Sequence, residues 1–419
     1  MLADTPKPGI PRSIRWMILV LGLILLVSTF WKKGRLGDNS RSRFITVERL
    51  VEKNTWAHAA PGDTTPFPLS IDAIKLNDRI YSSKPPLYPL VMAGEAKVLK
   101  AVTGWEFYAH RKDYNRFLVL LNQILPYVLM LWVAMRFLLA FTQNRWTLHF
   151  MLLALSLGCL AYGYTPEINN HSPASSLLLI AVWGVYRVWV GEERRRWMMA
   201  LLGLLIGYTM ALELPSMAFG LVLLGLLLWR DRLGGLLAGL CMVLPALPTL
   251  WIFHEISGEW KPFYMQGKLY RYEGSYWTKP QGSDLFKEPQ ALYFLKTLVG
   301  PKGLWAVTPL LALPLALWVP VVRRRLPSLG TVLKWMALPV LILITYIGMR
   351  TYNYGGDCIG MRWYIVFMPV LMFMAWPVVE WLGQRTWGRV ASVILLAASM
   401  VQNVIALYMD CFIDIEKVF

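Results

Sequence analysis

Two short polar segments follow the first apolar run of the sequence, and their residue types suit a reaction at a phosphorylated substrate. The first is Asp-Asn-Ser-Arg at residues 38–41, and the second is Ser-Ser-Lys-Pro-Pro-Leu at residues 82–87. An ionised Asp38 can act as a general base that takes a proton from a hydroxyl group. Lys84 places a cation on backbone that the following prolines stiffen, beside the surface where a lipid phosphate would lie. We therefore predict a general base next to a phosphate-binding cation.

Each of these residues also has a simpler interpretation. Asp38 could be the N-cap of the helix that the apolar spacing predicts over residues 42–53. The two roles are compatible, because a helix N-terminus favours the ionised carboxylate that a base requires. Lys84 could be an ordinary solvated lysine, although its apolar neighbours Tyr81 and Leu87, and its place after Asp38 in one loop, favour a binding role.

A third candidate is the glycine-rich loop that leads to Arg362. Its sequence from residue 352 is Tyr-Asn-Tyr-Gly-Gly-Asp-Cys-Ile-Gly-Met-Arg-Trp. Three glycines let the backbone approach a ligand closely and present N–H groups to it, and a guanidinium can grip phosphate oxygens with two hydrogen bonds. We therefore assign phosphate binding to Arg362 and substrate contacts to Tyr354 and Asp357. The alternative is a tight turn whose arginine reaches lipid headgroups.

Other polar residues are weaker candidates for substrate contact, because several lie at predicted helix ends where polar residues are expected in any case. They flank the first two segments, or lie in the stretch 164–171 and at two later helix ends. These candidates are Asn39, Arg41, Tyr81, Asn170, His171, Glu213 and His254. The histidines lack the spacing to one another or to glutamate that a metal site uses. The sequence therefore leaves the need for a divalent metal open and indicates no set of ligands for it.

The composition is that of an all-α protein embedded in lipid. The chain has 419 residues, of which 56% are hydrophobic, and the apolar residues come in long uncharged runs. Such runs are stable in a bilayer as helices, each of about 20 residues. We predict about eleven spans on this basis. Their centres lie near Leu23, Leu129, Leu155, Val182, Leu205, Val222, Val243, Leu313, Val340, Leu371 and Leu396.

The positive charge predicts how the spans are oriented. The net charge is +17, and the basic residues separate the spans instead of forming one face, which argues against nucleic-acid binding. With the N-terminus inside, the arginine-rich short loops at 192–196, 230–232, 323–325 and 385–389 all lie on the cytoplasmic side. The long loops and the glycine-rich loop are then external, in an oxidising compartment that permits a disulfide between Cys358 and Cys411.

The chain divides into five parts on this topology. The predicted parts are 1–31, a cytoplasmic tail and the first span; 32–115, an external loop with amphipathic juxtamembrane helices and Asp38; 116–253, spans two to seven; 254–303, a second external loop; and 304–419, spans eight to eleven with the glycine-rich loop 350–362. The second juxtamembrane helix is predicted over 87–102.

Together these features resemble the integral-membrane glycosyltransferases of the GT-C fold, in particular the bacterial protein mannosyltransferase and lipid A aminoarabinose transferase families. The resemblance rests on Asp38 after the first span, the amphipathic helices, the Ser-Lys-Pro-Pro-Leu segment and the late Tyr-Gly-Gly…Gly-Met-Arg-Trp loop. It covers the whole topology, although the specific motifs are short. It implies that Asp38 is the catalytic base and that Lys84 contacts a carrier phosphate. Many relatives have Asp-Glu where this chain has Asp-Asn, which leaves the sugar and any metal requirement open.

The resemblance implies a hexosyl- or pentosyltransferase that moves a sugar, with inversion, from a polyprenyl-phosphate carrier to an acceptor hydroxyl. The acceptor would be a membrane-associated glycan, lipid or protein outside the bacterial plasma membrane, and membrane lipids would be further partners. The lack of a Rossmann or P-loop motif agrees with a lipid-linked donor.

Two other functions remain as alternatives. One is a transporter or flippase of a lipid-linked sugar, but such proteins usually place ionisable residues near the bilayer midplane. The predicted span centres have few such residues, and the polar clusters lie on the outer side. The other alternative is a membrane ligase that transfers a whole glycan, which would share much of this architecture.

Overall fold

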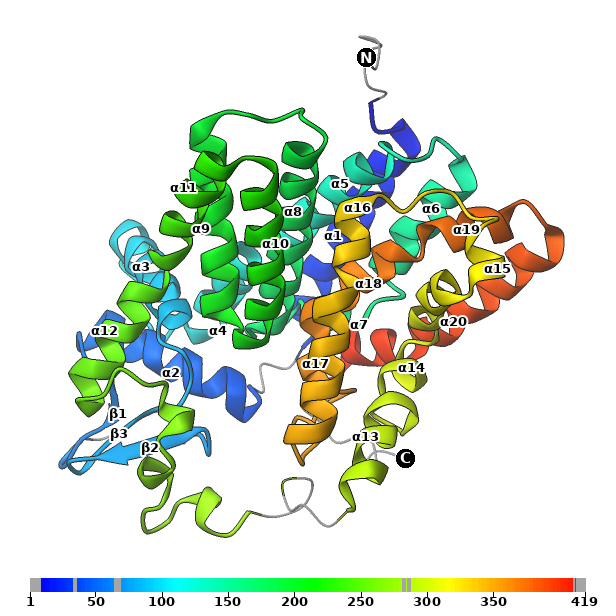
Figure 1. The fold of residues 1–419 in the computed structure, drawn as a ribbon. Coiled ribbons are helices and arrows are strands. Elements are labelled where there is room, and N and C mark those ends of the chain that lie inside the picture. The colour runs from blue at the N-terminus through cyan, green and yellow to red at the C-terminus, as the bar shows by residue number, and fades with distance from the viewer. Residues whose placement is uncertain are drawn as a thin grey trace.

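The computed structural model describes residues 9–32, 36–63, 69–280, 284, 288–409 and 411, and these form helices with one small sheet (Figure 1). Residues 1–8 of the predicted cytoplasmic tail, residues 33–35, 64–68, 281–283 and 285–287 of the predicted external loops, and residues 410 and 412–419 lie outside the described part. The helical elements up to the second long loop are α1 (Arg12–Trp31), α2 (Asp38–Glu52), α3 (Leu87–Thr103), α4 (Arg111–Val119), η1 (Leu120–Ile124), α5 (Leu125–Leu138), α6 (Arg145–Leu155), α7 (Leu160–Tyr164), α8 (His171–Trp189), α9 (Arg196–Leu212), η2 (Leu214–Ser216), α10 (Met217–Arg230), α11 (Arg232–Val243) and α12 (Ala246–Ser257). The later helical elements are η3 (Phe263–Met265), η4 (Gly267–Tyr270), η5 (Tyr276–Thr278), α13 (Gln290–Val299), α14 (Leu304–Val307), η7 (Pro309–Trp318), α15 (Pro320–Arg323), α16 (Thr331–Trp335), α17 (Ala337–Arg350), η8 (Arg362–Phe367), α18 (Met368–Met374), α19 (Trp376–Gly383) and α20 (Thr386–Tyr408).

The long apolar helices make this chain a multi-pass membrane protein. Among the described residues, 5 helices are long and apolar enough to span a bilayer, and two bent pairs raise the number to 7. The bends are 104° between α14 and η7 and 41° between α18 and α19. Every predicted span centre lies in a helical element, but α9 and α10 are short for a span. The predicted count of about eleven spans is therefore not confirmed.

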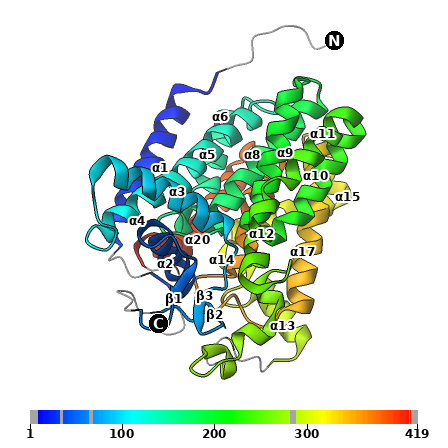
Figure 2. The same ribbon diagram turned by 90° about the vertical axis from the view of Figure 1, so that its left-hand side faces the viewer.

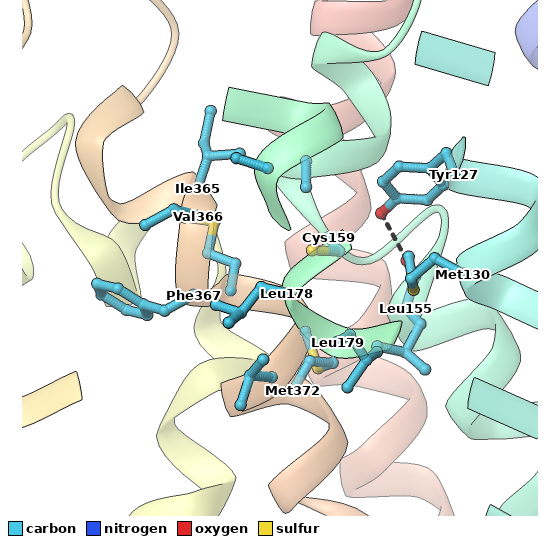
Figure 3. Packing of buried hydrophobic residues seen from close by; sticks show 14 of the residues in the cluster. Tyr127, Met130, Leu155, Cys159, Leu178, Leu179, Ile365, Val366, Phe367 and Met372 are labelled. Atoms are coloured by element: carbon cyan, nitrogen blue, oxygen red, sulfur yellow. Dashed lines mark hydrogen bonds between the residues drawn. The ribbon is translucent and has the colours of Figure 1, made fainter. Parts of the chain in front are cut away.

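One predicted span is broken where α6 ends. Ser156 leaves the helical conformation with φ −107° and ψ −97°. Asn403 of α20 donates hydrogen bonds to the carbonyls of Ser156, at 3.1 Å, and Leu157, at 2.6 Å, where the regular helical bonding ends. Freed backbone groups at membrane depth need such partners, because lipid supplies none. Figure 3 shows a further one: Tyr127 of α5 donates to the Leu155 carbonyl at 2.8 Å.

The helix predicted over 42–53 is α2, which begins earlier, at Asp38. Its apolar side was predicted to lie on the bilayer surface, but Phe44, Val47 and Leu50 pack into the protein core. Its polar side is not solvated, because Arg43 and Arg49 are buried. α3 and strands β1 (Ala57–Ala59) and β3 (Arg79–Ser82) contact α2. The chain that follows α2 folds back over this helix and covers part of its polar side.

The small sheet is antiparallel, in the order β1-β3-β2, with β2 at Ala73–Leu76. Asn77 and Asp78 join β2 to β3 with φ values of 47° and 57°. Two positive φ angles are typical of the tight turn that matches the twist of a hairpin, and Asn and Asp tolerate them. This turn sets the register that pairs Ala73 with Ser82.

The predicted external segments gather at one end of the molecule. In Figures 1 and 2, α2, the sheet, the loop after α12 and the loop between α17 and η8 lie together, far from the start of α1. Hydrogen bonds join these segments: Trp277 Nε1 donates to the Ile71 carbonyl at 2.9 Å, and Asn353 Nδ2 donates to Asp284 Oδ1 at 2.9 Å. The fold therefore brings three distant parts of the sequence to one surface.

His58 in β1 should make the stability of this region sensitive to acid. Its Nε2 atom lies 2.8 Å from Thr46 Oγ1. Burial and the charge of Arg49 lower the pKa of His58 from 6.5 to about 3. The unfolded chain binds this proton below about pH 6.5 and the folded chain does not, so the free energy of unfolding should fall as the pH drops from 6.5 to about 3.

The variant His58→Gln tests this expectation, since Gln cannot titrate but keeps a polar atom near Thr46. Melting temperatures measured from about pH 8 to about pH 4 should decline less steeply in the variant than in the wild type. Parallel curves would show that His58 does not stay neutral in the folded protein.

Candidate active site

The hairpin gives Lys84 an ionic partner that is distant in sequence. Because Ala73 pairs with Ser82, the chain just beyond each strand also meets, and the Ser83 N–H donates to the Asp72 carbonyl at 3.1 Å. Lys84 Nζ lies 2.9 Å from Asp72 Oδ1, with side-chain exposures of 17% and 12%. Lys84 is therefore not the solvated lysine of the simpler interpretation.

Ser42 of α2 anchors the backbone around the ion pair of Lys84 and Asp72. Its hydroxyl donates to the Asp72 carbonyl at 2.9 Å and lies 2.7 Å from the hydroxyl of Ser82. The Lys84 N–H in turn donates to Ser82 Oγ at 3.1 Å. The backbone on both sides of the ion pair is thereby attached to one buried helix.

Two further cations, Arg362 and Arg43, lie within electrostatic range of the ion pair. Burial alone would raise the pKa of the Asp72 carboxyl, but the charges of Lys84, Arg362 and Arg43 lower it below its ordinary value. Burial, with the charges of Arg362 and Arg43, lowers the pKa of Lys84, while Asp72 opposes that change. The structure thus brings the two predicted phosphate-binding residues within electrostatic reach of each other. Their role stays a prediction.

The position of Arg362 depends on the glycine-rich loop. Gly355 has φ +84°, and a Cβ atom there would lie 3.0 Å from Arg362 Cγ. A side chain at this position would therefore be strained and would crowd the arginine. Asp284, in the second predicted external segment, holds the loop in place, since it accepts hydrogen bonds from Asn353 and from the Tyr276 hydroxyl, each at 2.9 Å.

Arg43 links the first loop to the polar stretch 164–171. Its guanidinium donates to Asn170 Oδ1 at 2.6 Å and to the Asn39 carbonyl at 3.0 Å. Asn170 donates to the Glu213 carboxylate, which also lies 2.8 Å from His171 Nδ1. Four predicted substrate-binding residues, Asn39, Asn170, His171 and Glu213, therefore form one buried network around a cation.

Asp38 is the first residue of α2 and not its cap. The N-cap is Gly37, and the helix has no side-chain cap hydrogen bond in the described structure. The Asp38 carboxylate instead accepts the Ile71 N–H at 3.2 Å and lies 3.3 Å from the Arg41 guanidinium. Its side chain is 37% exposed. The capping interpretation was therefore wrong, and the carboxylate is partly exposed. Its role as a base stays a prediction.

The segment from Ser70 to Asp72 connects Asp38 with the Lys84 ion pair. Ser70 Oγ donates to the Asp38 carbonyl at 2.7 Å and accepts the Asp72 N–H at 3.1 Å. The base and the cation predicted from sequence are therefore attached to the same short stretch of backbone.

Four other predicted residues have different surroundings. Tyr81 packs on a small apolar cluster with Ile74 and Phe253, and its contact with substrate stays a prediction. His254 is exposed and stacks on Trp260 at 4.3 Å. Tyr354 donates to Glu288 Oε2 at 2.8 Å, and Asp357 is exposed, with its charge near Asp284.

The described residues contain no disulfide bond. They also contain no cluster of side chains that could hold a metal ion. Cys358 is not bonded to Cys411, although the Ile359 N–H donates to the Cys411 carbonyl at 2.9 Å. Within 9–32, 36–63, 69–280, 284, 288–409 and 411, no three His, Cys, Asp or Glu side chains are placed to share a metal ion.

The sequence reasoning missed Asp72 and Arg43. Arg43 gives no signal in the sequence, because its burial depends on Asn170, which lies far away along the chain. A signal for Asp72 was present: Asn77-Asp78 between two alternating segments is typical of a hairpin turn. Pairing outward from that turn would have placed residue 72 beside residues 83 and 84.

Comparison with solved structures identifies the fold. The chain is similar to ArnT from Cupriavidus metallidurans in the apo state, with a TM-score of 0.57, 17% identity, and coverage of 93% of this chain and 64% of that chain. A more distant similarity is to the archaeal oligosaccharyltransferase AglB from Archaeoglobus fulgidus, in complex with an inhibitory peptide and a dolichol-phosphate, with a TM-score of 0.47, 12% identity, and coverage of 95% and 56%. No protein-family model and no curated protein matches the chain. The chain therefore has the GT-C fold and spans less than two thirds of the length of ArnT.

Proposed function

We propose that this GT-C chain is a glycosyltransferase that moves a sugar from a polyprenyl-phosphate carrier to an acceptor hydroxyl. The observation that carries the proposal is the group of cations around Lys84. Within the described residues, the buried cluster brings Lys84, Arg43 and Arg362 to the carboxylates of Asp72 and Glu213. Cations that converge in a mostly buried site can bind a phosphate group through charge-assisted hydrogen bonds, and a lipid phosphate at the membrane boundary is such a group.

The reaction needs one base and no protein acid. Ionised Asp38 takes the proton of the acceptor hydroxyl as its oxygen attacks the anomeric carbon. The bond from that carbon to the carrier phosphate breaks in the same displacement, which inverts the anomeric configuration. The phosphate leaves as an anion, and Lys84 and Arg362 stabilise the charge that it gains in the transition state.

The donor and acceptor define the test of this function. Mass spectrometry of lipids that co-purify with the protein should detect a polyprenyl phosphate or its glycoside. The purified protein should then release polyprenyl phosphate from a polyprenyl-phosphate sugar when an acceptor is added. Movement of a labelled lipid-linked sugar across vesicles without transfer would instead identify a flippase, and transfer of a preassembled glycan would identify a ligase.

The proposed site lies outside the plasma membrane of a bacterium, with the N-terminus in the cytoplasm. Arg79 in β3 and Glu273 in the second external loop are exposed. In a Cys241→Ser background, Arg79→Cys and Glu273→Cys should react with an impermeant maleimide in intact cells. Arg194→Cys, in an arginine-rich short loop, should react only after the cells are permeabilised. The reverse pattern would place the site in the cytoplasm.

A further inference from the structure

We propose that Asp72 is a positioning residue of the transfer reaction: its carboxylate holds the Lys84 ammonium against the carrier phosphate, at a fixed distance from Asp38. This inference rests on the proposed function. It assigns a role to a buried carboxylate that the displacement itself does not use.

The backbone of Asp72 is held on several sides, so its carboxylate can move only by rotation of a short side chain. Its carbonyl accepts hydrogen bonds from Ser42 Oγ at 2.9 Å and from the Ser83 N–H at 3.1 Å. Its N–H donates to Ser70 Oγ at 3.1 Å. These contacts come from α2, from the chain after β3 and from the preceding loop. Asp72 therefore cannot follow Lys84 if the lysine moves.

Lys84 needs such a fixed partner. A lysine ammonium is a compact charge on a flexible four-carbon chain, with three N–H donors. Asp72 Oδ1, at 2.9 Å from Nζ, takes one donor and leaves two for phosphate oxygens. The prolines after Lys84 stiffen its backbone but leave its side chain free to rotate. The carboxylate thus supplies the orientation that the backbone cannot.

Asp72 also offsets repulsion among the cations. The charged groups that face Lys84 are Asp72, Arg362 and Arg43. Asp72 is the one of these three that favours the protonated lysine. Without it, burial and the two guanidinium groups would lower the pKa of Lys84 further, and the lysine would lose its charge at a lower pH.

The same segment fixes the distance to the base. Ser70 and Ile71 bind the Asp38 carbonyl and carboxylate, at 2.7 and 3.2 Å. Trp277 of the second external loop holds the Ile71 carbonyl at 2.9 Å. A shift of about 1 Å between reacting groups can lower a rate about a hundredfold. The attachment of both groups to one segment therefore matters for the rate.

The test compares Asp72→Asn with Asp78→Asn in the purified full-length protein. Asp78 is a matched control, since it pairs with Lys75 at 3.0 Å on the same hairpin but is 76% exposed. Its positive φ of 57° also suits Asn. With a polyprenyl-phosphate sugar as donor, Asp72→Asn should lower kcat by about a hundredfold. The alkaline limb of its pH–rate profile should move to lower pH. Asp78→Asn should change neither.

Each outcome decides the question. Wild-type kcat and pH profile in Asp72→Asn, or faster transfer through tighter phosphate binding, would overturn the positioning role and leave the proposed function intact. Absence of transfer by the wild type with every lipid donor would overturn both. If Asp72→Asn fails to fold, Ser70→Ala keeps both charges and loosens the segment. It should lower kcat without moving the alkaline limb, and an unchanged kcat would refute the role of the segment.

Discussion

Replacement of Asp38 with Asn should reduce sugar transfer by about 10²–10⁴, the usual contribution of a general base. The amide oxygen can still accept the Ile71 N–H that now binds the carboxylate at 3.2 Å, so the start of α2 should keep its structure. The amide cannot accept the proton of the acceptor hydroxyl. The rate of transfer from a polyprenyl-phosphate sugar should therefore fall, whereas the melting temperature, measured on the same preparations, should stay near that of the wild type.

α4 provides a control for this substitution. Asp113 also lies in the first turn of a helix and pairs with an arginine three residues later, Arg116, at 3.2 Å. The same arrangement joins Asp38 and Arg41 at 3.3 Å. Asp113→Asn should leave transfer unchanged. If Asp38→Asn retains turnover within about tenfold of the wild type, the loss is smaller than removal of a general base would cause. The Asp38 carboxylate would then only attach α2 to the loop at Ile71.

Removal of either predicted phosphate ligand should lower kcat by about 10²–10³, the loss expected when one donor to a developing anion is removed. The leaving phosphate gains charge as the sugar departs, so Lys84 and Arg362 stabilise the transition state more than the bound donor. Lys84→Ala and Arg362→Ala should therefore lower kcat beyond any change in KM for the lipid donor. Arg362→Lys should not restore the full rate if the guanidinium forms two hydrogen bonds to phosphate.

Lys53 is the control for the loss of a lysine from the same loop. It is 44% exposed and pairs with Asp63 at 3.1 Å, so Lys53→Ala should have little effect on transfer. Lys84→Ala also leaves Asp72 buried without its ammonium partner, and melting curves should accompany the kinetics. Equal transfer rates in Lys84→Ala and Lys53→Ala would show that Lys84 is not a phosphate ligand, and the carrier phosphate would then bind elsewhere.

The linear sequence was sufficient for the parts of this protein that depend on local pattern. Long apolar runs predict membrane helices because lipid leaves the backbone no other partner, and the predicted centres lie in helical elements of the structure. The spacing of Phe44, Val47 and Leu50 predicts α2 and its buried side. The short motifs around Lys84 and Arg362 were enough to suggest the GT-C fold, which the similarity to ArnT supports.

Only the tertiary structure decided what surrounds those residues. The partner of Lys84 is Asp72 because a tight turn at Asn77 and Asp78 sets a strand register, and register is a relation between segments. Arg43 is buried where its guanidinium meets Asn170, which lies far away in the sequence, whereas helical periodicity indicates only that one side of a helix differs from the other. Burial and charge pairing depend on contacts between distant residues, so the sequence indicated the cations and the base, and the fold determined their partners.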